Sequence, residues 1–236
     1  MTYSIGHEGL RSLLHLAGCF EQMNQFVHLS IDRKILGICS MDHDDTTVFH
    51  AEIPLSGSDV CQGPWTVCVS CESVRLCVQH TRGPLEIRPR STYWEVRPPD
   101  GEWVTWSADP SGSNMKPDTL REPMVAPMYM QTADFLLYVQ HLSICESVVN
   151  VSSQGPGHLR FEAEGELIAV AIQHAELDES APVVCTSVVF KYIRAILPVL
   201  QRVDTLVAHI MPQQLVIRVD LPGYTLTTTL KSQIGV

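Results

Sequence analysis

Short runs in which apolar and polar residues alternate dominate this chain, and they predict half-buried antiparallel strands. In residues 159–164 every second side chain is apolar, and residues 215–221 place their charged side chains on one side only. The same alternation occurs in residues 206–210 and 93–97. Turn-forming sequences separate such runs, for example the Pro-Asp-Gly sequence at 99–101. The pattern therefore predicts a strand-dominated architecture.

Four segments have the apolar spacing of helices instead. They span about residues 10–17, 71–79, 132–142 and 188–197. In the first, Arg11, Ser12 and His15 are expected on the side opposite the apolar stripe. Thr132 is expected to cap the third helix. Pro198 is expected to end the fourth, because proline has no amide hydrogen to donate.

The order of these pieces repeats along the chain. Each half begins with a helix, continues with strands, and then has a shorter helix and further strands. A His-Ala-Glu triplet at 50–52 recurs at 174–176, about 124 residues later. The chain therefore reads as two similar halves of about 118 residues each.

A segment rich in Pro, Gly, Ser and Asn begins at residue 109 and has no clear periodicity up to residue 127. We expect it to be a long interdomain linker. The predicted fold class is α+β, with two similar domains at 1–108 and 128–236. Each domain is expected to have helices on one face of antiparallel sheets.

The charge balance limits the function classes. The chain has 236 residues and a formal net charge of −10, which speaks against nucleic-acid binding by the whole surface. Cations gathered on one face remain compatible with it. No apolar run reaches the roughly 18 residues of a membrane span, and the N-terminus lacks the apolar core of a signal peptide. We expect a soluble intracellular protein without a membrane partner.

Eight cysteines could indicate disulfides or a metal site, but several lie in apolar stretches where cysteine acts as a buried hydrophobe. Cys68 and Cys71 have CxxC spacing, with Cys77 nearby, so zinc binding or disulfide exchange is an alternative. No second pair completes such a site. Residues 42–45, Asp-His-Asp-Asp, could hold a divalent cation or form a hairpin turn. No phosphate-binding loop or nucleophile motif occurs. We therefore expect a protein that is not an enzyme and that binds neither a cofactor nor a metal ion.

Several stretches resemble sliding clamps of the proliferating cell nuclear antigen type, which are DNA polymerase processivity factors. They are the Ile-Cys-Ser-Met-Asp strand at 38–42, the helix and strand at 135–143 and 148–151, the Phe-x-Ala-x-Gly-Glu-Leu sequence at 161–167, and the helix start at 190–193. The resemblance implies the DNA clamp fold. The short length and the missing acidic C-terminal tail are compatible with a clamp encoded by a large DNA virus.

The resemblance also implies a function in DNA replication and repair. Such a clamp encircles duplex DNA without sequence specificity and tethers DNA polymerase and other proteins that carry clamp-binding peptides. It is placed on DNA by a clamp loader, in the nucleus or at a viral replication site. A homotrimeric ring would close by pairing of edge strands, for which the strands near 77–87 and 183–193 are candidates. Two alternatives stay open: a subunit of a checkpoint-type heterotrimeric clamp, and a β-rich protein-interaction module without DNA binding.

By resemblance, the helix faces opposite the apolar stripes line the bore and meet phosphates without reading bases. The DNA-facing residues would be Arg11, His15, Arg75, His80, Arg82, His141, Lys191 and Arg194. Gln79, Leu137 and Gln140 stand where the family usually has cations, so we expect a weak positive field to which histidines add only at lower pH. The alternative is an ordinary solvated helix face.

The resemblance further implies a pocket for partner peptides, which would insert a short helical turn with apolar anchors. Its residues would be Met41, Val48, Leu120, Met124, Pro212, Thr229 and Leu230. The alternative for these positions is plain core packing.

Overall fold

The structure, a computed structural model, describes residues 1–44, 47–57, 65–107, 128–142, 148–153, 159–164, 169–174, 184–189, 192–211 and 213–232. The chain forms two compact units. Unit 1 contains Met1–Met41, Phe49–Thr119 and Leu221–Leu226, and unit 2 contains Asp42–Val48, Leu120–Asp220 and Thr227–Val236. The predicted domain boundaries at 108–109 and 127–128, and the predicted linker, fall at residues outside this description and stay predictions.

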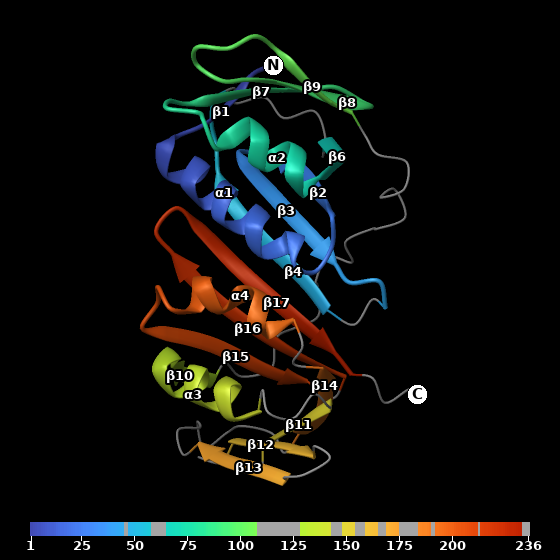
Figure 1. Cartoon of the computed structure of the whole chain (residues 1–236), viewed down its shortest axis with the longest axis vertical. Helices are drawn as coiled ribbons and strands as arrows, with labels where there is room; N and C mark the ends of the chain where they lie inside the picture. Colours follow the sequence, from blue (N-terminus) through green and yellow to red (C-terminus); the bar gives the residue numbers. More distant parts are fainter. Residues whose placement is uncertain are drawn as a thin grey trace. The chain divides into compact units, whose positions relative to one another are not determined.

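The first half of the chain has two helices and nine strands among its described residues (Figure 1). In chain order they are β1 (Tyr3–Ile5), α1 (His7–Glu21), β2 (Phe26–Asp32), β3 (Ile35–Met41), β4 (Thr47–Pro54), β5 (Ser56–Gly57), β6 (Trp65–Ser70), α2 (Cys71–Val78), β7 (Leu85–Pro89), β8 (Tyr93–Arg97) and β9 (Val104–Ser107).

The second half has two helices and eight strands among its described residues. They are β10 (Met128–Gln131), α3 (Thr132–Leu142), β11 (Val148–Ser153), β12 (Leu159–Glu164), β13 (Ala169–His174), β14 (Val184–Val189), α4 (Ile193–Leu200), β15 (Thr205–Met211), β16 (Gln214–Leu221) and β17 (Tyr224–Lys231).

Apart from the two-residue β5, the two halves have the same element order and the same strand neighbours. The first has the runs β6-β2-β3-β4 and β1-β7-β8-β9, and the second has β14-β11-β12-β13 and β10-β15-β16-β17. The strands pair antiparallel throughout β6-β2-β3, β1-β7-β8-β9, β14-β11-β12-β13 and β10-β15-β16. The predicted α+β class and the predicted internal repeat are therefore confirmed.

In unit 1, α1 and α2 lie side by side against the strands β2 and β6 (Figure 1). The ring centroids of Phe20 on α1 and Phe49 on β4 are 5.6 Å apart. The five-stranded sheet β5-β1-β7-β8-β9 turns Ile87, Trp94 and Val96 inward, and none of these three side chains is exposed. Burying each such side chain contributes about 1.5–3 kcal/mol, so this apolar layer fixes the positions of the helices and the sheet.

The apolar side of α1 is wider than the sequence predicted. Leu10 and Leu13 are buried as expected, but Ser12, which was expected on the solvent side, is buried too. Its hydroxyl donates a hydrogen bond to the carbonyl oxygen of Glu8 at 3.0 Å. This intrahelical bond satisfies a polar group that burial would otherwise penalise.

In unit 2, aromatic side chains of α3 pack on β12. Phe161 meets Phe135 edge to face with a centroid separation of 6.4 Å, and meets Tyr138 at 5.7 Å. Helix α4 adds Ile193 and Ile196, both fully buried. The second core is therefore built like the first, because large apolar side chains pack the helices onto a sheet.

The predicted fourth helix was wrong at both ends. Val188 and Val189 belong to β14, and α4 starts only at Ile193. β-branched side chains favour the pleated sheet, which explains the strand. Pro198 lies inside α4, and the amide of Gln201 still donates to the carbonyl of Leu197 at 3.0 Å. A single missing amide donor therefore does not stop this helix.

The other helix predictions are closer. Ser70 caps α2, since its hydroxyl accepts a hydrogen bond from the amide of Ser73 at 3.1 Å. Thr132 is the first residue of α3 rather than a flanking cap, and its amide donates to the carbonyl of Asp204 at 2.9 Å. Among the described residues, no helix combines the length and the apolar character that crossing a bilayer requires.

Candidate functional site

The exposed side of α1 and α2 carries the first predicted DNA contacts. Arg11 is exposed and His15 is half-buried on α1, and Arg75 lies on the neighbouring α2. The Nε atom of Arg75 is 3.8 Å from a carboxylate oxygen of Glu21, and each side chain is 42% exposed. An exposed pair of this kind is worth only about 0–1 kcal/mol. It nevertheless places a carboxylate beside a predicted phosphate contact.

Acidic side chains balance the basic ones on the four helices. The helices carry the cations Arg11, Arg75 and Arg194, the carboxylates Glu8, Glu21, Glu72 and Asp134, and the titratable His7, His15 and His141. With neutral histidines, the helices therefore have no excess of positive charge. The prediction of DNA contacts included only the basic residues and histidines. Glu72 and Asp134 lie within predicted helical segments, whereas Glu8 and Glu21 lie outside the predicted segment 10–17 and belong to a helix only in the structure.

On the helices of unit 2, His141 and Arg194 are exposed, as predicted. Leu137 of α3, one of the positions for which the resemblance implied a cation, is an apolar side chain that is 49% exposed. Arg202 is exposed in the turn that follows α4 and was not predicted. Lys191 lies outside the described residues, so its predicted role is not addressed.

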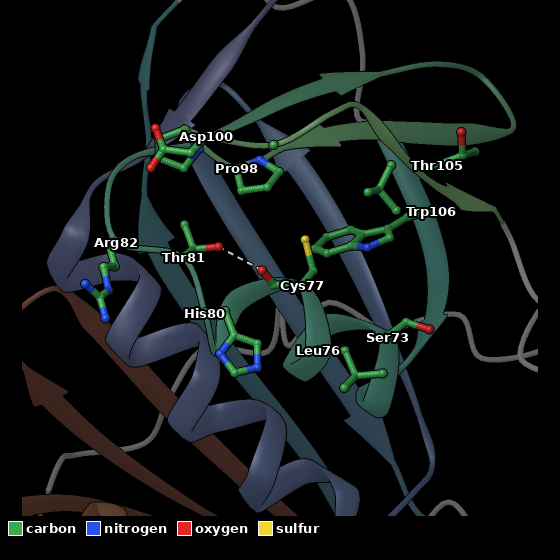
Figure 2. Close-up of a pocket in the computed structure, with 13 residues that line it drawn as sticks. Ser73, Leu76, Cys77, His80, Thr81, Arg82, Pro98, Asp100, Thr105 and Trp106 are labelled. Atoms are coloured by element: carbon green, nitrogen blue, oxygen red, sulfur yellow. Dashed lines mark hydrogen bonds between the residues drawn. The ribbon is translucent and has the colours of Figure 1, made fainter.

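His80 and Arg82 do not lie on a helix face, because α2 ends at Val78. They line a groove of about 580 Å³ between α2, the turn after it and the segment that joins β8 to β9 (Figure 2). The Thr81 hydroxyl fixes this turn by donating to the carbonyl of Cys77 at 2.8 Å.

The apolar part of the groove wall contains two exposed side chains. Leu76 of α2 is 54% exposed and Val104 of β9 is 48% exposed, beside the buried Trp106. Large exposed apolar side chains are common on surfaces that contact another protein. The groove therefore combines exposed apolar side chains with His80 and Arg82, two residues that were predicted to contact DNA.

Strands at the edges of the sheets are candidates for contacts between copies of the chain. Among the described strands, β9 has only β8 as a hydrogen-bonded neighbour, whereas β7 lies between β1 and β8. The predicted interface strand near 77–87 was therefore wrong, since Cys77 is helical and β7 is an interior strand. β14, predicted near 183–193, does lie at a sheet edge, as does β13 at the opposite end of the same sheet.

The predicted peptide-pocket residues have mixed exposure. Met41 at the end of β3 and Val48 on β4 are half-buried. Thr229 and Leu230 of β17 are buried, with 1% and 0% exposure. Leu120, Met124 and Pro212 lie outside the described residues. The pocket stays a prediction.

The CxxC pair lies in the interior. Cys68 and Cys71 are both buried, and the Cys71 thiol lies 3.4 Å from the carbonyl oxygen of Asn24, to which it donates. Burial raises the pKa of Cys71 to about 12, with a further contribution from the charge of Glu21. Zinc binds the thiolate, not the thiol. Within the described part of the chain, no three His, Cys, Asp or Glu side chains are placed to hold a metal ion together.

The alternative cation site at 42–45 is a turn in its described part. The Asp42 carboxylate accepts a hydrogen bond from the amide of Thr47 at 2.9 Å, and the Asp42 amide donates to the Thr47 carbonyl at 3.1 Å. Asp42 is only 2% exposed. Its carboxylate therefore closes the connection between β3 and β4.

No family model and no curated protein sequence matches this chain. Solved structures do match it over its whole length. A PCNA2–PCNA3 complex from Sulfolobus tokodaii matches with a TM-score of 0.71 and 14% identity, covering 99% of both chains. The structure of A. fulgidus PCNA with the C-terminal region of FEN-1 matches with a TM-score of 0.74 and 15% identity, covering 100% of both chains. PCNA from Thermococcus kodakaraensis matches with a TM-score of 0.73 and 12% identity, covering 98% of this chain and 100% of that one.

These matches cover 98–100% of this chain, although the sequence identity is only 12–15%. They give no support to the expected viral origin. Agreement of this extent in backbone course, together with the repeated element order, establishes the architecture: the chain has the fold of the PCNA-type sliding clamps.

Proposed function

We propose that this protein is a sliding clamp, a non-enzymatic subunit of a ring that encircles duplex DNA and tethers replication and repair proteins to it inside the cell. The match of the fold to PCNA structures over the full length of both chains carries this proposal. The repeat within the chain supports it independently, because two similar units per subunit are the building blocks of a ring.

The charge on the helices defines how such a clamp would hold DNA. A protein that binds through phosphate contacts needs several uncompensated cations, because each neutralised phosphate adds to the affinity. The described helices carry four carboxylates and three arginines. Its retention on DNA would therefore rest on closure of the ring, with Arg11, Arg194 and the unpredicted Arg202 as weak guides for the duplex.

Ring closure would join an edge strand of one copy to an edge strand of the next in a homotrimer. Among the described strands, β9 has a neighbour on one side only, and the exposed side chains of Leu76 and Val104 lie beside it. On the other side, β13 is the more accessible edge strand, because β14 already contacts β15. Pairing of β9 with β13 would continue an antiparallel sheet across the interface and cover the apolar groove wall.

Partner proteins would bind through short peptides. The A. fulgidus PCNA structure contains the C-terminal region of FEN-1, so peptide binding is a property of that relative. For this chain we propose the same mode of binding for DNA polymerase, with Met41 and Val48 as the half-buried apolar contacts. A clamp loader would place the ring on DNA.

Two measurements test this function together. Light scattering on the purified protein should give a mass three times that of the 26.3 kDa chain. The protein should also lengthen the products that a cognate replicative polymerase makes on a long primed template under single-binding conditions. A monomer that leaves product length unchanged would refute a homotrimeric clamp.

A heteromeric ring is the second candidate, because one structural match is a complex of two different PCNA chains. In that case the isolated chain would be a monomer or dimer, and the mass of three subunits would appear only after mixing with a second clamp subunit. The same light-scattering measurement on the chain alone and on the mixture separates the two candidates.

A further inference from the structure

The outer face of the five-stranded sheet carries charged side chains in alternating register. Ile87 on β7 and Trp94 on β8 point into the core and are fully buried. Their neighbours in sequence, Arg88 on β7 and Glu95 and Arg97 on β8, must point to the opposite face, because side chains alternate along a strand. These three residues are half-buried and form a polar surface.

An aromatic side chain lies within this surface. The guanidinium of Arg88 lies over the ring of Trp103 at 3.9 Å from its centroid, and that of Arg97 lies 4.8 Å away. At such distances the electrons on the face of the ring attract the positively charged guanidinium groups. These contacts restrict the rotamers of both arginines, so these groups are already ordered before any ligand arrives.

The carboxylates on this face are distributed unevenly. Glu86 pairs with Arg97, with 2.6 Å between the oxygen and nitrogen atoms, and Glu95 pairs with Arg90 at 3.0 Å. Arg88 has no carboxylate within 4.0 Å among the described residues, and its Nε atom donates instead to the Thr2 hydroxyl at 3.2 Å. Arg88 is therefore the uncompensated cation of this face.

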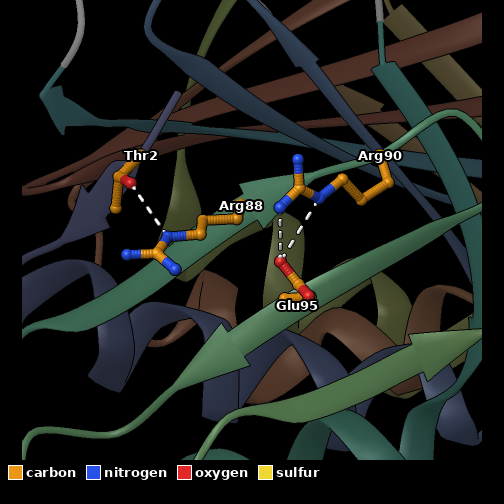
Figure 3. A network of polar contacts seen from close by, with 4 residues as sticks. All are labelled: Thr2, Arg88, Arg90 and Glu95. Atoms are coloured by element: carbon orange, nitrogen blue, oxygen red, sulfur yellow. Dashed lines mark hydrogen bonds and ion pairs between the residues drawn. The ribbon is translucent and has the colours of Figure 1, made fainter.

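The pairing of Glu95 is informative, because Glu95 lies directly opposite Arg88 in the strand register. Cross-strand neighbours of opposite charge normally meet. Here the Glu95 carboxylate instead accepts two hydrogen bonds from Arg90, at 3.0 and 3.3 Å, and points away from Arg88 (Figure 3). Arg90 thus holds the carboxylate of the register partner of Arg88 away from the Arg88 guanidinium.

We propose that Arg88 and Trp103 form a docking site for a carboxylate of a partner protein, an Asp or Glu side chain that lies beside an apolar residue. Thr2 and Trp103 hold the Nε edge and one face of the guanidinium, which leaves the two terminal nitrogens to bind a carboxylate in bidentate fashion. The Trp103 ring supplies apolar contact area for the neighbouring residue. This surface is distinct from the helices and from the groove at β9.

Charge decides between a protein and a nucleic acid as the partner. A nucleic-acid strand brings closely spaced phosphates and is bound by several free cations at once. On this face two of the three arginines are already paired, and Glu86 and Glu95 would repel the phosphates on either side of Arg88. A single carboxylate with apolar neighbours meets the one open guanidinium without that repulsion.

Indole NMR signals of the full-length protein provide the test. The protein has four tryptophans, and the signal of Trp103 is identified by its loss in Trp103→Phe. The probes are acetyl-Leu-Glu-Leu-amide, its Gln counterpart, inorganic phosphate and a short DNA duplex. We expect the Glu peptide to shift the Trp103 signal with an affinity about fivefold or more above that of the Gln peptide, and Arg88→Gln to abolish this difference.

Two further variants separate docking from a purely structural role. Arg90→Gln should weaken binding of the Glu peptide, because Glu95 becomes free to turn to Arg88, and the double variant Arg90→Gln with Glu95→Gln should restore it. Arg218→Gln, which breaks an exposed ion pair on β16, should leave the response unchanged.

Equal responses to the Glu and Gln peptides would overturn the proposal, as would full binding by Arg88→Gln. A tighter response to phosphate or to the duplex than to the Glu peptide would also overturn it, since the site would then be an anion or nucleic-acid contact. The comparison of the two peptides uses the unaltered protein, so it decides the question even where a variant fails to fold.

Discussion

At the scale of single residues, the surroundings of a side chain decide its chemistry. Cys39 lies within β3 and is only 7% exposed. Burial raises the pKa of its thiol from 9.0 to about 12. A thiol in this state is a small apolar side chain and a poor nucleophile. Burial raises the pKa of Cys71 in the same way, so both residues carry a thiol rather than the more reactive thiolate at neutral pH.

The raised pKa of Cys39 predicts a loss of stability in alkali. The unfolded thiol loses its proton near pH 9.0, whereas the folded one keeps it up to about pH 12. Above pH 9.0 the unfolded state therefore binds fewer protons, and the free energy of unfolding falls as the pH rises. Urea unfolding at about pH 8 and about pH 10.5 should show a shallower decline for Cys39→Ala than for the unaltered protein.

Cys185→Ala is the matched control for this prediction, because Cys185 is exposed on β14. Its decline between the two pH values should equal that of the unaltered protein. An identical decline in Cys39→Ala and Cys185→Ala would contradict the assignment of this pH dependence to the buried thiol.

Because Glu21 pairs with Arg75, we predict that removing the Glu21 carboxylate increases the affinity of the protein for DNA. Glu21→Gln removes the negative charge 3.8 Å from Arg75 and should tighten duplex binding by about two- to fivefold at low salt. The gain should fade at high salt, since exposed charges are screened there. Fluorescence anisotropy with a labelled duplex measures both. Glu52→Gln makes the same change at an exposed position of β4 and should have little effect on duplex binding. Equal gains of affinity in both variants would contradict the prediction.

Sequence reasoning identified the exposed cations of the helices but could not identify their partners. Arg75 and Glu21 are far apart in the chain and meet only because α1 and α2 pack together. The separation of Arg88 from Glu95 likewise depends on strand register and on Arg90. No periodicity records such contacts, so the electrostatics of the surface needed the structure.

At the scale of elements, regular alternation predicted strands well and ambiguous apolar runs did not. The charged alternation at 93–97 and 215–221 gave β8 and β16 almost to the residue. The apolar stretch before α4 fits both a buried strand and a helix, so Val188 and Val189 were misassigned. The edge or interior position of a strand depends on which strands pair, and this misled the prediction for β7.

The unpaired edge at β9 predicts that one exposed apolar side chain controls assembly. Val104→Asp should shift the proposed trimer towards monomer, because it would place a charge in the interface that we propose at β9. Light scattering over a concentration series measures the shift, which we expect to be at least about tenfold in the midpoint concentration. Circular dichroism should show that the fold is kept.

Ile35→Asp is the control for this change. Ile35 is exposed to a similar degree, 43% against 48% for Val104, and lies on β3 away from β9. It should leave the trimer intact. Dissociation by Ile35→Asp to the same extent would show that any added charge destabilises the assembly, and the role given to β9 would be lost.

At the scale of the whole molecule, the internal repeat was the most informative feature of the sequence. It needed only the order of helices and strands, which survives when individual side chains diverge, and the structure contains it in both halves. The compact units are harder to predict from the sequence, because each unit includes a short segment from the other half of the chain. Unit 1 includes Leu221–Leu226, and unit 2 includes Asp42–Val48. Such exchanges follow from strand pairing and leave no mark on composition.

The acidity of the chain and the balanced charge of its helices lead to one account of DNA retention. A net charge of −10 opposes loose association with a polyanion. A clamp with this surface would stay on DNA because the ring is closed, and would slide easily because few phosphates hold it. Retention should therefore resist salt but depend on the continuity of the DNA.

Retention on a linear duplex blocked at both ends tests this claim most directly. The protein is allowed to thread onto DNA with biotin at both ends, streptavidin is added, and free protein is removed by gel filtration at high salt. We predict that the protein stays with the DNA and is released when a restriction enzyme cuts the duplex between the blocks. Failure to stay on the blocked DNA, or retention that persists after the cut, would contradict the account.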